Sequence, residues 1–324
     1  MRFWDSVCMP RGGSGQKVFV CSVHCRSCIR ACDKKRIHGK YRVDKAHHVY
    51  MIGSSVDPDP FQLPGIGMTF AASPARVALV TGAGRGIGAA LCIHLARNGF
   101  HVVPADIDAA NADKVAASLG DGHLARAVDV ADEAAVTALF DDVETRIGPV
   151  GVLICAAGLL LLPGGARPLI ADLQLDTWER SFAVNARGAF LCSREWLRRR
   201  NALPVEHGRA VFFGSVAAQL GGYRSSAAYI AAKAAVMGYA KAFAREAAPL
   251  GMTANVIAPG LIDTEMLRST VTGSGALAVA AQSIPLGRIG TVQDVVAAVS
   301  YLLSPAAAYI TGSVIDVNGG YRMQ

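Results

Sequence analysis

Charge is scarce in most of this chain, and cysteine is scarce outside its beginning. Residues 75–324 carry 21 Lys and Arg against 20 Asp and Glu, a net charge of +1, so we expect no basic face that would bind nucleic acid. The only cysteines of this part are Cys92, Cys155 and Cys192, each within an apolar segment. Their scatter excludes a disulfide framework and is typical of a reducing compartment.

Long apolar runs are missing as well. The longest uncharged run, residues 147–166, contains five Gly and two Pro, which indicates a buried strand followed by a loop and not a membrane span. Near the N-terminus, the apolar stretch 18–23 is too short for the core of a signal peptide and is interrupted by Cys21 and Ser22. We therefore expect a cytoplasmic protein with no membrane partner.

Residues 1–74 differ from the rest in composition. They carry 11 Lys and Arg against 5 Asp and Glu and have no sustained helical or strand periodicity. The cluster Cys21-x3-Cys25-x2-Cys28-x3-Cys32 is a candidate zinc or iron–sulfur site, but its spacing matches neither usual ligand set. We interpret this stretch as a disordered extension without metal. Two alternatives stay open: a natural start at Met68, or a transit peptide, against which the acidic residues and cysteines argue.

A glycine-rich turn follows the first apolar run of the main part. Residues 76–80 have the character of a buried strand, Thr81-Gly-Ala-Gly-Arg-Gly-Ile-Gly88 comes next, and residues 89–98 form a helical stretch. Such a turn lets backbone amides at a helix N-terminus approach a pyrophosphate without interference from Cβ atoms. With a second strand at 100–105, the order predicts a βαβ unit that binds a dinucleotide.

Asp106 ends this second strand, twenty residues beyond Gly86. A carboxylate there can accept hydrogen bonds from both ribose hydroxyls and repels a 2′-phosphate, so it predicts NAD as the cofactor. Arg85 argues the other way, because a basic residue in the turn can contact a 2′-phosphate. A purely structural role, in which Asp106 caps a loop, is the alternative.

The remaining strands and helices alternate. We predict further strands at 123–128, 150–155, 210–213, 252–257 and 312–317, and helices at 178–189, 229–250 and 292–303. Apolar strands alternating with helices predict a single-domain, doubly wound Rossmann α/β fold over residues 75–324, with a seven-stranded parallel sheet and helices on both faces. Ligands of such sheets bind outside the carboxyl ends of the strands.

Tyr229 and Lys233 lie in a stretch of good helix formers, so their spacing of four places them on one helix face. An ammonium beside a phenol favours phenolate, and the pair is then suited to general acid–base catalysis at neutral pH. Such pairs also occur by chance on many helices.

Residues 74–324 resemble the short-chain dehydrogenase/reductase family over nearly their whole length. The resemblance rests on Thr81-Gly82-x3-Gly86-x-Gly88, on Asp129, on Pro259-Gly260-x3-Thr264 and on the ending Gly312-Ser-Val-Ile-Asp-Val-Asn-Gly-Gly320. It implies a cofactor-dependent oxidoreductase with a small-molecule alcohol or ketone substrate, assembled as a homodimer or homotetramer. The implied cofactor contacts are Gly82, Arg85, Gly86, Ile87, Gly88, Asp106, Ile107, Asp129, Val130, Ala156, Ala157, Gly158, Tyr229, Lys233, Pro259, Gly260, Ile262 and Thr264.

The resemblance also implies a catalytic tetrad of Asn185, Ser215, Tyr229 and Lys233. Tyr229 would exchange the proton of the alcohol, Ser215 would hydrogen-bond the same oxygen, and Lys233 would lower the pKa of Tyr229 and hold the nicotinamide ribose. Asn185 would anchor a water that links Lys233 to solvent. No metal is implied.

Two features depart from the family pattern. The usual Asn-Asn-Ala-Gly is replaced by Cys155-Ala-Ala-Gly158, from which we expect a modest loss of stability with cofactor binding intact. Ser215 precedes Tyr229 by fourteen residues, one more than is commonest, and the loop 217–227 is expected to absorb the difference.

The substrate pocket is expected to be mostly apolar. Its predicted walls suit a neutral or weakly polar secondary alcohol, whereas Arg224 or Arg268 would change that reading; residues 265–283 are interpreted as a mobile lid. Two other functions stay open: an NADPH-dependent 3-ketoacyl-carrier-protein reductase and a catalytically silent NAD-binding protein. The predicted walls are Leu159 to Leu162, Val216, Leu220, Tyr223 and residues 261–284.

Overall fold

The structure, a computed structural model, describes residues 76–222, 224–271 and 275–323, and the backbone of four short strands nearer the N-terminus. The chain divides into two compact units, Met1–Phe70 and Ala71–Gln324. In the first unit, the four strands form an antiparallel sheet in the order β1-β2-β4-β3, which the sequence analysis did not predict. These strands are β1 (Pro10–Arg11), β2 (Val18–Ser22), β3 (Lys40–Val43) and β4 (His48–Ile52).

Most of the cysteine cluster lies outside the described residues. Only Cys21 falls within a strand, β2, and its side chain is not described. The interpretation of residues 1–74 as a disordered extension without metal, and the alternative start at Met68, therefore stay predictions.

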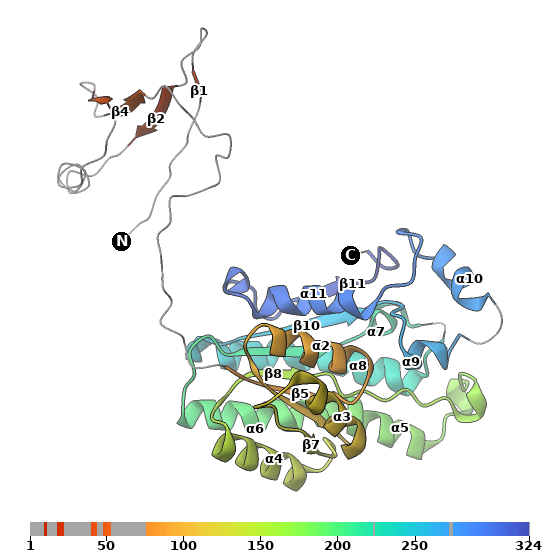
Figure 1. Cartoon of the computed structure of the whole chain (residues 1–324). Coiled ribbons are helices and arrows are strands. Elements are labelled where there is room, and N and C mark those ends of the chain that lie inside the picture. Colours follow the sequence, from red (N-terminus) through yellow and green to blue (C-terminus); the bar gives the residue numbers. More distant parts are fainter. Residues whose placement is uncertain are drawn as a thin grey trace. The chain divides into compact units, whose positions relative to one another are not determined.

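The second unit is built on a seven-stranded parallel sheet with helices on both faces, as predicted (Figure 1). The strand order is β11-β10-β9-β8-β5-β6-β7, so the chain reverses its direction of travel across the sheet between β5 and β8. That reversal creates the crevice in which doubly wound sheets bind ligands. The strands are β5 (Val77–Thr81), β6 (His101–Asp106), β7 (Arg126–Ala127), β8 (Val150–Cys155), β9 (Arg209–Phe213), β10 (Thr253–Pro259) and β11 (Val314–Val317).

The central strand β5 shows why the sheet is covered on both faces. All five of its residues are buried, and their side chains alternate between two cores. Val77 and Leu79 pack into the core beneath α4, α6 and α8, whereas Ala78 and Val80 pack into the core beneath α2 and α11. The helices are α2 (Gly86–Arg97), α3 (Ala109–Leu119), α4 (Glu133–Arg146), α5 (Leu175–Phe182), α6 (Gly188–Ala202), α7 (Val216–Leu220), α8 (Ala227–Ala247), α9 (Glu265–Arg268), α10 (Ala276–Gln282) and α11 (Val292–Leu303).

Three predicted elements differ from the observed ones. The strand predicted at 123–128 is only the two-residue β7. Before it, the His123 ring accepts the backbone N–H of Val102 (3.1 Å), and Pro104 of β6 has no N–H to donate to a ladder. The helix predicted at 178–189 is interrupted by a π-helical turn, η3 (Ala183–Arg187), between α5 and α6. The loop predicted at 217–227 begins with α7, which ends at Gly221 in the left-handed conformation.

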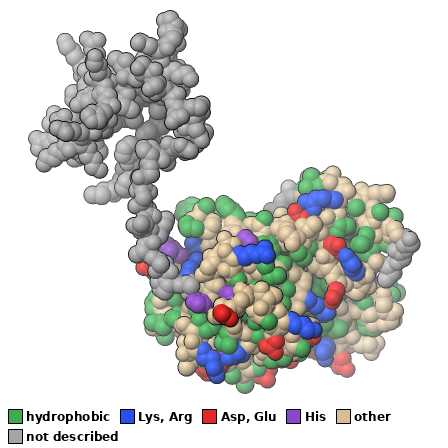
Figure 2. Space-filling model, viewed as in Figure 1, with side chains coloured by type: hydrophobic (Ala, Val, Ile, Leu, Met, Phe, Trp, Pro, Cys, Tyr) green, Lys and Arg blue, Asp and Glu red, His purple; other side chains and the backbone are tan. Residues whose placement is uncertain are grey.

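Acidic and basic side chains are interspersed on the visible face of the second unit (Figure 2), in agreement with its small net charge. Among the described helices, none combines the length and the apolar character needed to span a bilayer.

Glu144 ties together three elements of this unit. One of its carboxylate oxygens accepts the backbone N–H of Val150 at the start of β8 (3.0 Å) and the guanidinium of Arg200 from α6 (2.6 Å). Arg200 is completely buried, so the Glu144 carboxylate compensates its charge where water cannot. Removing one partner of a buried pair leaves an uncompensated charge, which is strongly destabilising.

Replacing Glu144 by Ala is expected to lower the free energy of unfolding by about 3–5 kcal/mol. The matched control is Glu133→Ala on the same helix, since Glu133 forms an exposed pair with Arg194 and its loss should cost less than about 1 kcal/mol. Urea unfolding followed by circular dichroism measures both variants. Equal losses of unfolding free energy in the two variants would show that the buried pair of Glu144 and Arg200 stabilises the protein no more than the pair of Glu133 and Arg194 does.

Candidate active site

The glycine turn places the backbone at the centre of the site. Gly82 and Gly86 adopt positive φ angles of 68° and 55°, which favour glycine. A Cβ on Gly82 would lie 2.5 Å from Cα of Ala157, and one on Gly88 would lie 2.1 Å from the Gly82 carbonyl oxygen. These positions therefore admit only glycine, and the start of α2 stays open to a ligand.

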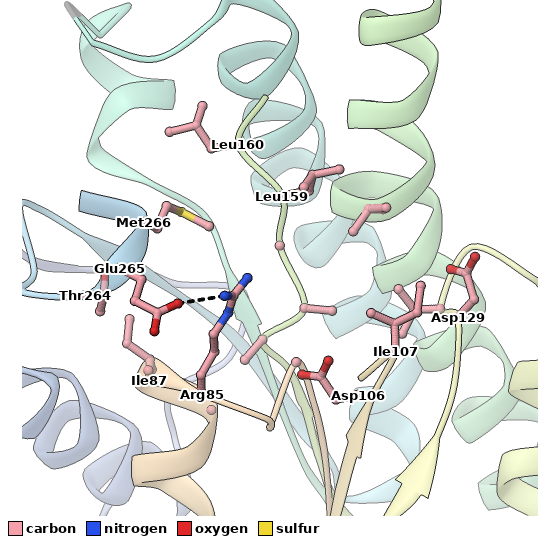
Figure 3. A pocket seen from close by; sticks show the side chains of 18 of the residues that line it. Arg85, Ile87, Asp106, Ile107, Asp129, Leu159, Leu160, Thr264, Glu265 and Met266 are labelled. Atoms are coloured by element: carbon pink, nitrogen blue, oxygen red, sulfur yellow. Dashed lines mark hydrogen bonds and ion pairs between the residues drawn. The ribbon is translucent and has the colours of Figure 1, made fainter. Parts of the chain in front are cut away.

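A cavity of about 620 Å³ lies outside the carboxyl ends of β5, β6 and β8 (Figure 3). Its size and its cradle of backbone fit an extended dinucleotide. Thirteen of the residues predicted to contact the cofactor line it: Gly82, Arg85, Gly86, Ile87, Gly88, Asp106, Ile107, Asp129, Val130, Ala156, Ala157, Gly158 and Thr264.

The lining also differs from the predicted set. Val128, Arg180, Val184, Glu265, Met266 and Ser269 line the cavity without having been predicted as cofactor contacts. Tyr229, Lys233, Pro259, Gly260 and Ile262 are not among its lining residues, and Ile262 instead lines a smaller cavity of about 240 Å³ beside β11.

Asp106 is held at the rim of the cavity by backbone amides. Its two carboxylate oxygens accept the N–H of Gly84 (2.8 Å) and of Asp108 (3.0 Å). The carboxylate therefore does order the loop, as the alternative reading supposed, and it also lines the cavity. Both roles are compatible, since a carboxylate has more acceptor positions than these two bonds use.

The far end of the cavity combines acidic and apolar groups. Asp129 accepts the N–H of Ala131 (2.9 Å), and Val130 packs so closely on Gly188 that a Cβ there would meet the valine at 2.6 Å. Ile107 is 70% exposed and points toward the cavity from the loop after β6 (Figure 3). A large apolar side chain exposed at a cleft is suited to cover a flat ring.

The four predicted catalytic residues come from three parts of the chain and lie together at the carboxyl edge of the sheet. Ser215 follows β9 and caps α7, and Tyr229 and Lys233 lie one turn apart on α8. Lys233 Nζ lies 5.9 Å from the centre of the Tyr229 ring. A Cβ built on Gly158 would lie 3.3 Å from Asn185 Oδ1 and 3.4 Å from Lys233 Nζ, which brings the fourth residue into the same group.

Burial dominates the acid–base properties of this group. It raises the pKa of Tyr229, and a hydrogen bond with Ser215 offsets part of the increase. The resemblance led us to expect that Lys233 lowers the pKa of Tyr229. The net shift of this pKa is upward, because desolvation outweighs the other contributions. Burial also lowers the pKa of Lys233 to about 8, and its ammonium donates to the Phe213 carbonyl at 2.9 Å.

Asn185 fastens the loop after β8 to the helix below it. Within the π turn, its side-chain oxygen accepts the N–H of Leu159 (2.9 Å), and its nitrogen donates to the Leu159 carbonyl (2.8 Å) and to that of Ser181 (3.0 Å). The side chain is 1% exposed. This arrangement gives Asn185 a structural role; its role toward a water stays a prediction.

Thr81 braces the segment Cys155-Ala-Ala-Gly158, where the sequence departs from the family pattern. The hydroxyl of Thr81 donates to the Ile154 carbonyl and accepts from the N–H of Ala157, each at 3.4 Å, so it bridges β5 and the end of β8. Cys155 itself is buried, and burial raises its pKa well above the ordinary value. It therefore serves as a small core residue and not as a nucleophile.

The predicted substrate walls are described only in part. Leu159 and Leu160 line the cavity, as expected, whereas Tyr223 lies outside the described residues. Arg268 forms a double hydrogen bond with Asp263 (2.8 and 3.0 Å), so its charge is already matched. Residues 265–283 contain α9 and α10, and their action as a lid stays a prediction.

Comparison with known proteins identifies the family. A family model described as enoyl-(acyl carrier protein) reductase matches residues 82–322. The chain belongs to the short-chain dehydrogenase/reductase family. It is 36% identical over 282 residues to an NADPH-dependent aldehyde reductase-like protein, chloroplastic, of Arabidopsis thaliana, covering 83% of this chain and 98% of the relative.

Two further relatives cover the second unit. The 3-oxoacyl-[acyl-carrier-protein] reductase of Escherichia coli is 34% identical over 248 residues, which are 76% of this chain and 98% of the relative. A solved structure of a blue fluorescent protein from a metagenomic library in complex with NADPH has a TM-score of 0.68 and 31% identity, covering 76% of this chain and 98% of that one. As a short-chain dehydrogenase/reductase, this protein is an oxidoreductase that uses a nicotinamide cofactor.

The lowered pKa of Lys233 predicts how the stability of the protein changes with pH. Its pKa of about 8 in the folded protein lies below the ordinary 10.5, so the unfolded chain binds more protons between these values. Stability must then rise with pH in that window. The wild type is expected to gain about 1–3 kcal/mol relative to Lys233→Met between pH 8 and pH 10.

Urea unfolding at several pH values measures this difference. The control is Lys241→Met, which removes an exposed lysine from the same helix and is expected to give a difference that is constant with pH. A wild-type advantage over Lys233→Met that stays flat or falls above pH 8 would contradict the prediction.

Proposed function

We propose that this protein transfers a hydride between NAD(H) and a secondary alcohol or ketone, with Tyr229 as the general acid and base. The observation that carries the proposal is the grouping of Tyr229, Lys233, Ser215 and Asn185 beside a dinucleotide-sized cavity. The same four residues occupy motifs that resemble the tetrad of the family. Tyr229 and Ser215 are each 8% exposed, so a reacting oxygen between them would be shielded from bulk water.

The cofactor supplies or accepts the hydride when it is bound. The glycine turn and the N-terminus of α2 are suited to hold its pyrophosphate, with Asp106 at the adenosine ribose and Asp129 and Val130 at the adenine. Thr264, at the start of α9, caps that helix through its hydroxyl and faces the cavity near Gly86, where it would meet the nicotinamide end.

The proton would move through Tyr229. In the oxidative direction its phenolate takes the proton of the alcohol, and in the reductive direction its hydroxyl returns one to the carbonyl oxygen. Ser215 would fix the same oxygen by a hydrogen bond. Lys233, anchored to the Phe213 carbonyl, would hold the nicotinamide ribose and favour phenolate when it is protonated.

The choice of NAD over NADP rests on Asp106. Its carboxylate lines the cavity and would face a 2′-phosphate, whose negative charge it repels. One relative is an NADPH-dependent aldehyde reductase-like protein and another was solved in complex with NADPH, which favours the other cofactor. We base the proposal on Asp106 because it belongs to this chain, and fluorescence titration with both cofactors tests it.

The apolar lining near the reactive end supports a neutral or weakly polar substrate. Leu159, Leu160, Val184 and Met266 provide much of this surface. Arg268 pairs with Asp263 and does not line the cavity. Among the described residues, the cations that line it are Arg85, which pairs with Glu265, and Arg180.

A second candidate is an NADPH-dependent reduction of a 3-oxoacyl group on an acyl carrier protein. It is favoured by the Escherichia coli relative and by Arg85, a cation on the glycine turn. The small net charge of residues 75–324 counts against it, because an acidic carrier would be attracted by a basic face.

We further propose that the protein is a cytoplasmic homodimer or homotetramer, although the chloroplastic relative offers another compartment.

Replacing Tyr229 by Phe is expected to lower turnover by about 10²–10⁴, the usual contribution of a positioned acid–base group. Cofactor affinity should stay within a factor of about 2, since the ring is retained. Steady-state reduction of a panel of ketones and fluorescence titration of the cofactor measure the two quantities.

The control for this variant is Tyr239→Phe. Tyr239 lies on the same helix, but its hydroxyl bonds Ser193 on α6 (2.8 Å) away from the cavity, so its loss should leave turnover nearly unchanged. Wild-type turnover in the Tyr229 variant would exclude the proposed mechanism.

The Asp106 carboxylate at the cavity leads to a prediction about the relative affinities for NADH and NADPH. NADH should bind more tightly than NADPH by about 2–4 kcal/mol, or on the order of 30- to 1000-fold, because a 2′-phosphate meets like charge and displaces hydrogen bonds. Asp106→Ser is expected to narrow this gap, and Asp106→Asn is the companion variant that keeps an acceptor for the Gly84 amide. Titration of NADH and NADPH fluorescence measures the preference. A wild-type preference for NADPH would favour the second candidate.

A further inference from the structure

One ion pair joins the two sides of the cofactor cavity. Arg85, on the glycine turn, donates to the carboxylate of Glu265, the first residue of α9, at 2.6 Å. The two residues are 180 positions apart in the sequence. Figure 3 shows their side chains pointing toward each other across the cavity, which both of them line.

Arg85 is the one charged residue of the glycine turn, residues 81–88. Its neighbour Gly84 donates to the Asp106 carboxylate at 2.8 Å, so the turn that carries Arg85 is tied to the end of β6. A 2′-phosphate on a bound dinucleotide would lie beside Asp106 and would need a cation to offset the repulsion. Arg85 is placed to supply that cation.

Glu265 competes for the same guanidinium. Arg85 and Glu265 are 74% and 72% exposed, so their ion pair is weak in absolute terms and can be exchanged for another anion. Contact of Arg85 with a phosphate would nevertheless require the pair to open or the phosphate to approach a second carboxylate. Either event disfavours NADP(H) and leaves NAD(H), which lacks that phosphate, nearly unaffected.

We propose that Glu265 is a specificity-determining residue, which holds Arg85 away from a 2′-phosphate and thereby strengthens the preference for NAD(H). This inference rests on the proposed function, because it assumes that the cavity binds the dinucleotide with its adenosine ribose at Asp106. Asp106 excludes the phosphate directly, whereas Glu265 acts through Arg85.

The position of Glu265 does not depend on Arg85. The hydroxyl of Thr264 caps α9 by accepting the N–H of Leu267 (3.4 Å), and Asp263 pairs with Arg268 across the length of this helix. Loss of the ion pair with Arg85 should therefore leave α9 folded. A substitution at Glu265 tests charge and not the integrity of the helix.

The test measures binding of NADPH and NADH by fluorescence titration to the full-length protein. Glu265→Gln is expected to tighten NADPH binding by about 3- to 10-fold while NADH binding changes by less than about 2-fold. In an Arg85→Met background, Glu265→Gln should change NADPH binding by less than about 2-fold, because the cation that Glu265 restrains is gone.

The matched control is Asp263→Asn. It removes the same charge two residues away, but Asp263 pairs with Arg268 and does not line the cavity, so the ratio of the two affinities should stay constant. Raising the ionic strength to about 0.5 M should reduce the effect of Glu265→Gln by screening an exposed pair.

Two results would overturn the inference. One is an unchanged NADPH affinity in the Glu265→Gln variant. The other is a gain in NADPH affinity of equal size when Glu265→Gln is made in the Arg85→Met background, which would mean that Glu265 repels the phosphate directly and does not act through Arg85. Failure of the proposed cofactor preference is separate, because it would appear as a wild-type preference for NADPH. The variants measure whether Glu265 affects NADPH affinity through Arg85, and this measurement does not depend on which cofactor the wild type prefers.

Discussion

The site depends on a close approach of backbone to backbone at the end of β5. Gly82 and Gly88 lie where any Cβ would collide with Ala157 or with the Gly82 carbonyl, at 2.5 and 2.1 Å. Because these contacts leave no room for side chains, the turn packs directly against the end of β8 and α2 begins at the mouth of the cavity. The N–H groups at the helix start are then available to an anion, and the predicted catalytic residues after β9 and on α8 lie beyond β8, the strand next to β5.

Desolvation is the second constraint, and it acts on both members of the acid–base pair. Burial raises the pKa of Tyr229 and lowers that of Lys233, so each group is biased toward its neutral form. Deprotonation of Tyr229 therefore needs groups that stabilise the phenolate, the role proposed for Ser215 and for the protonated form of Lys233. Asn185 and Thr81 support this environment from below, since their side chains bind backbone groups of the loop that borders it.

The parts that followed from the sequence are those fixed by local pattern. The strand–glycine turn–helix order predicted the position of the cavity, and the spacing of Tyr229 and Lys233 predicted one helix face. The parts that were missed depend on contacts between distant residues. The His123 ring that accepts the Val102 N–H before β7, and the π turn that directs Asn185 onto Leu159, are side-chain events that no hydrophobic period encodes. The net direction of the Tyr229 pKa was missed for the same reason, because burial is a property of the folded chain.

Cofactor choice shows how such distant contacts refine a motif. Read alone, Asp106 favours NAD and Arg85 favours NADP, and the sequence offers no rule for combining them. In the structure, the Arg85 guanidinium meets a carboxylate that arrives from another part of the chain, and Asp106 is fixed by the amide next to Arg85. The Asp106 carboxylate, the Glu265 carboxylate and the Arg85 guanidinium thus line the same cavity. Under the proposed binding mode, a 2′-phosphate would add a third anion to this lining, and we propose that the two carboxylates together disfavour it more than either would separately.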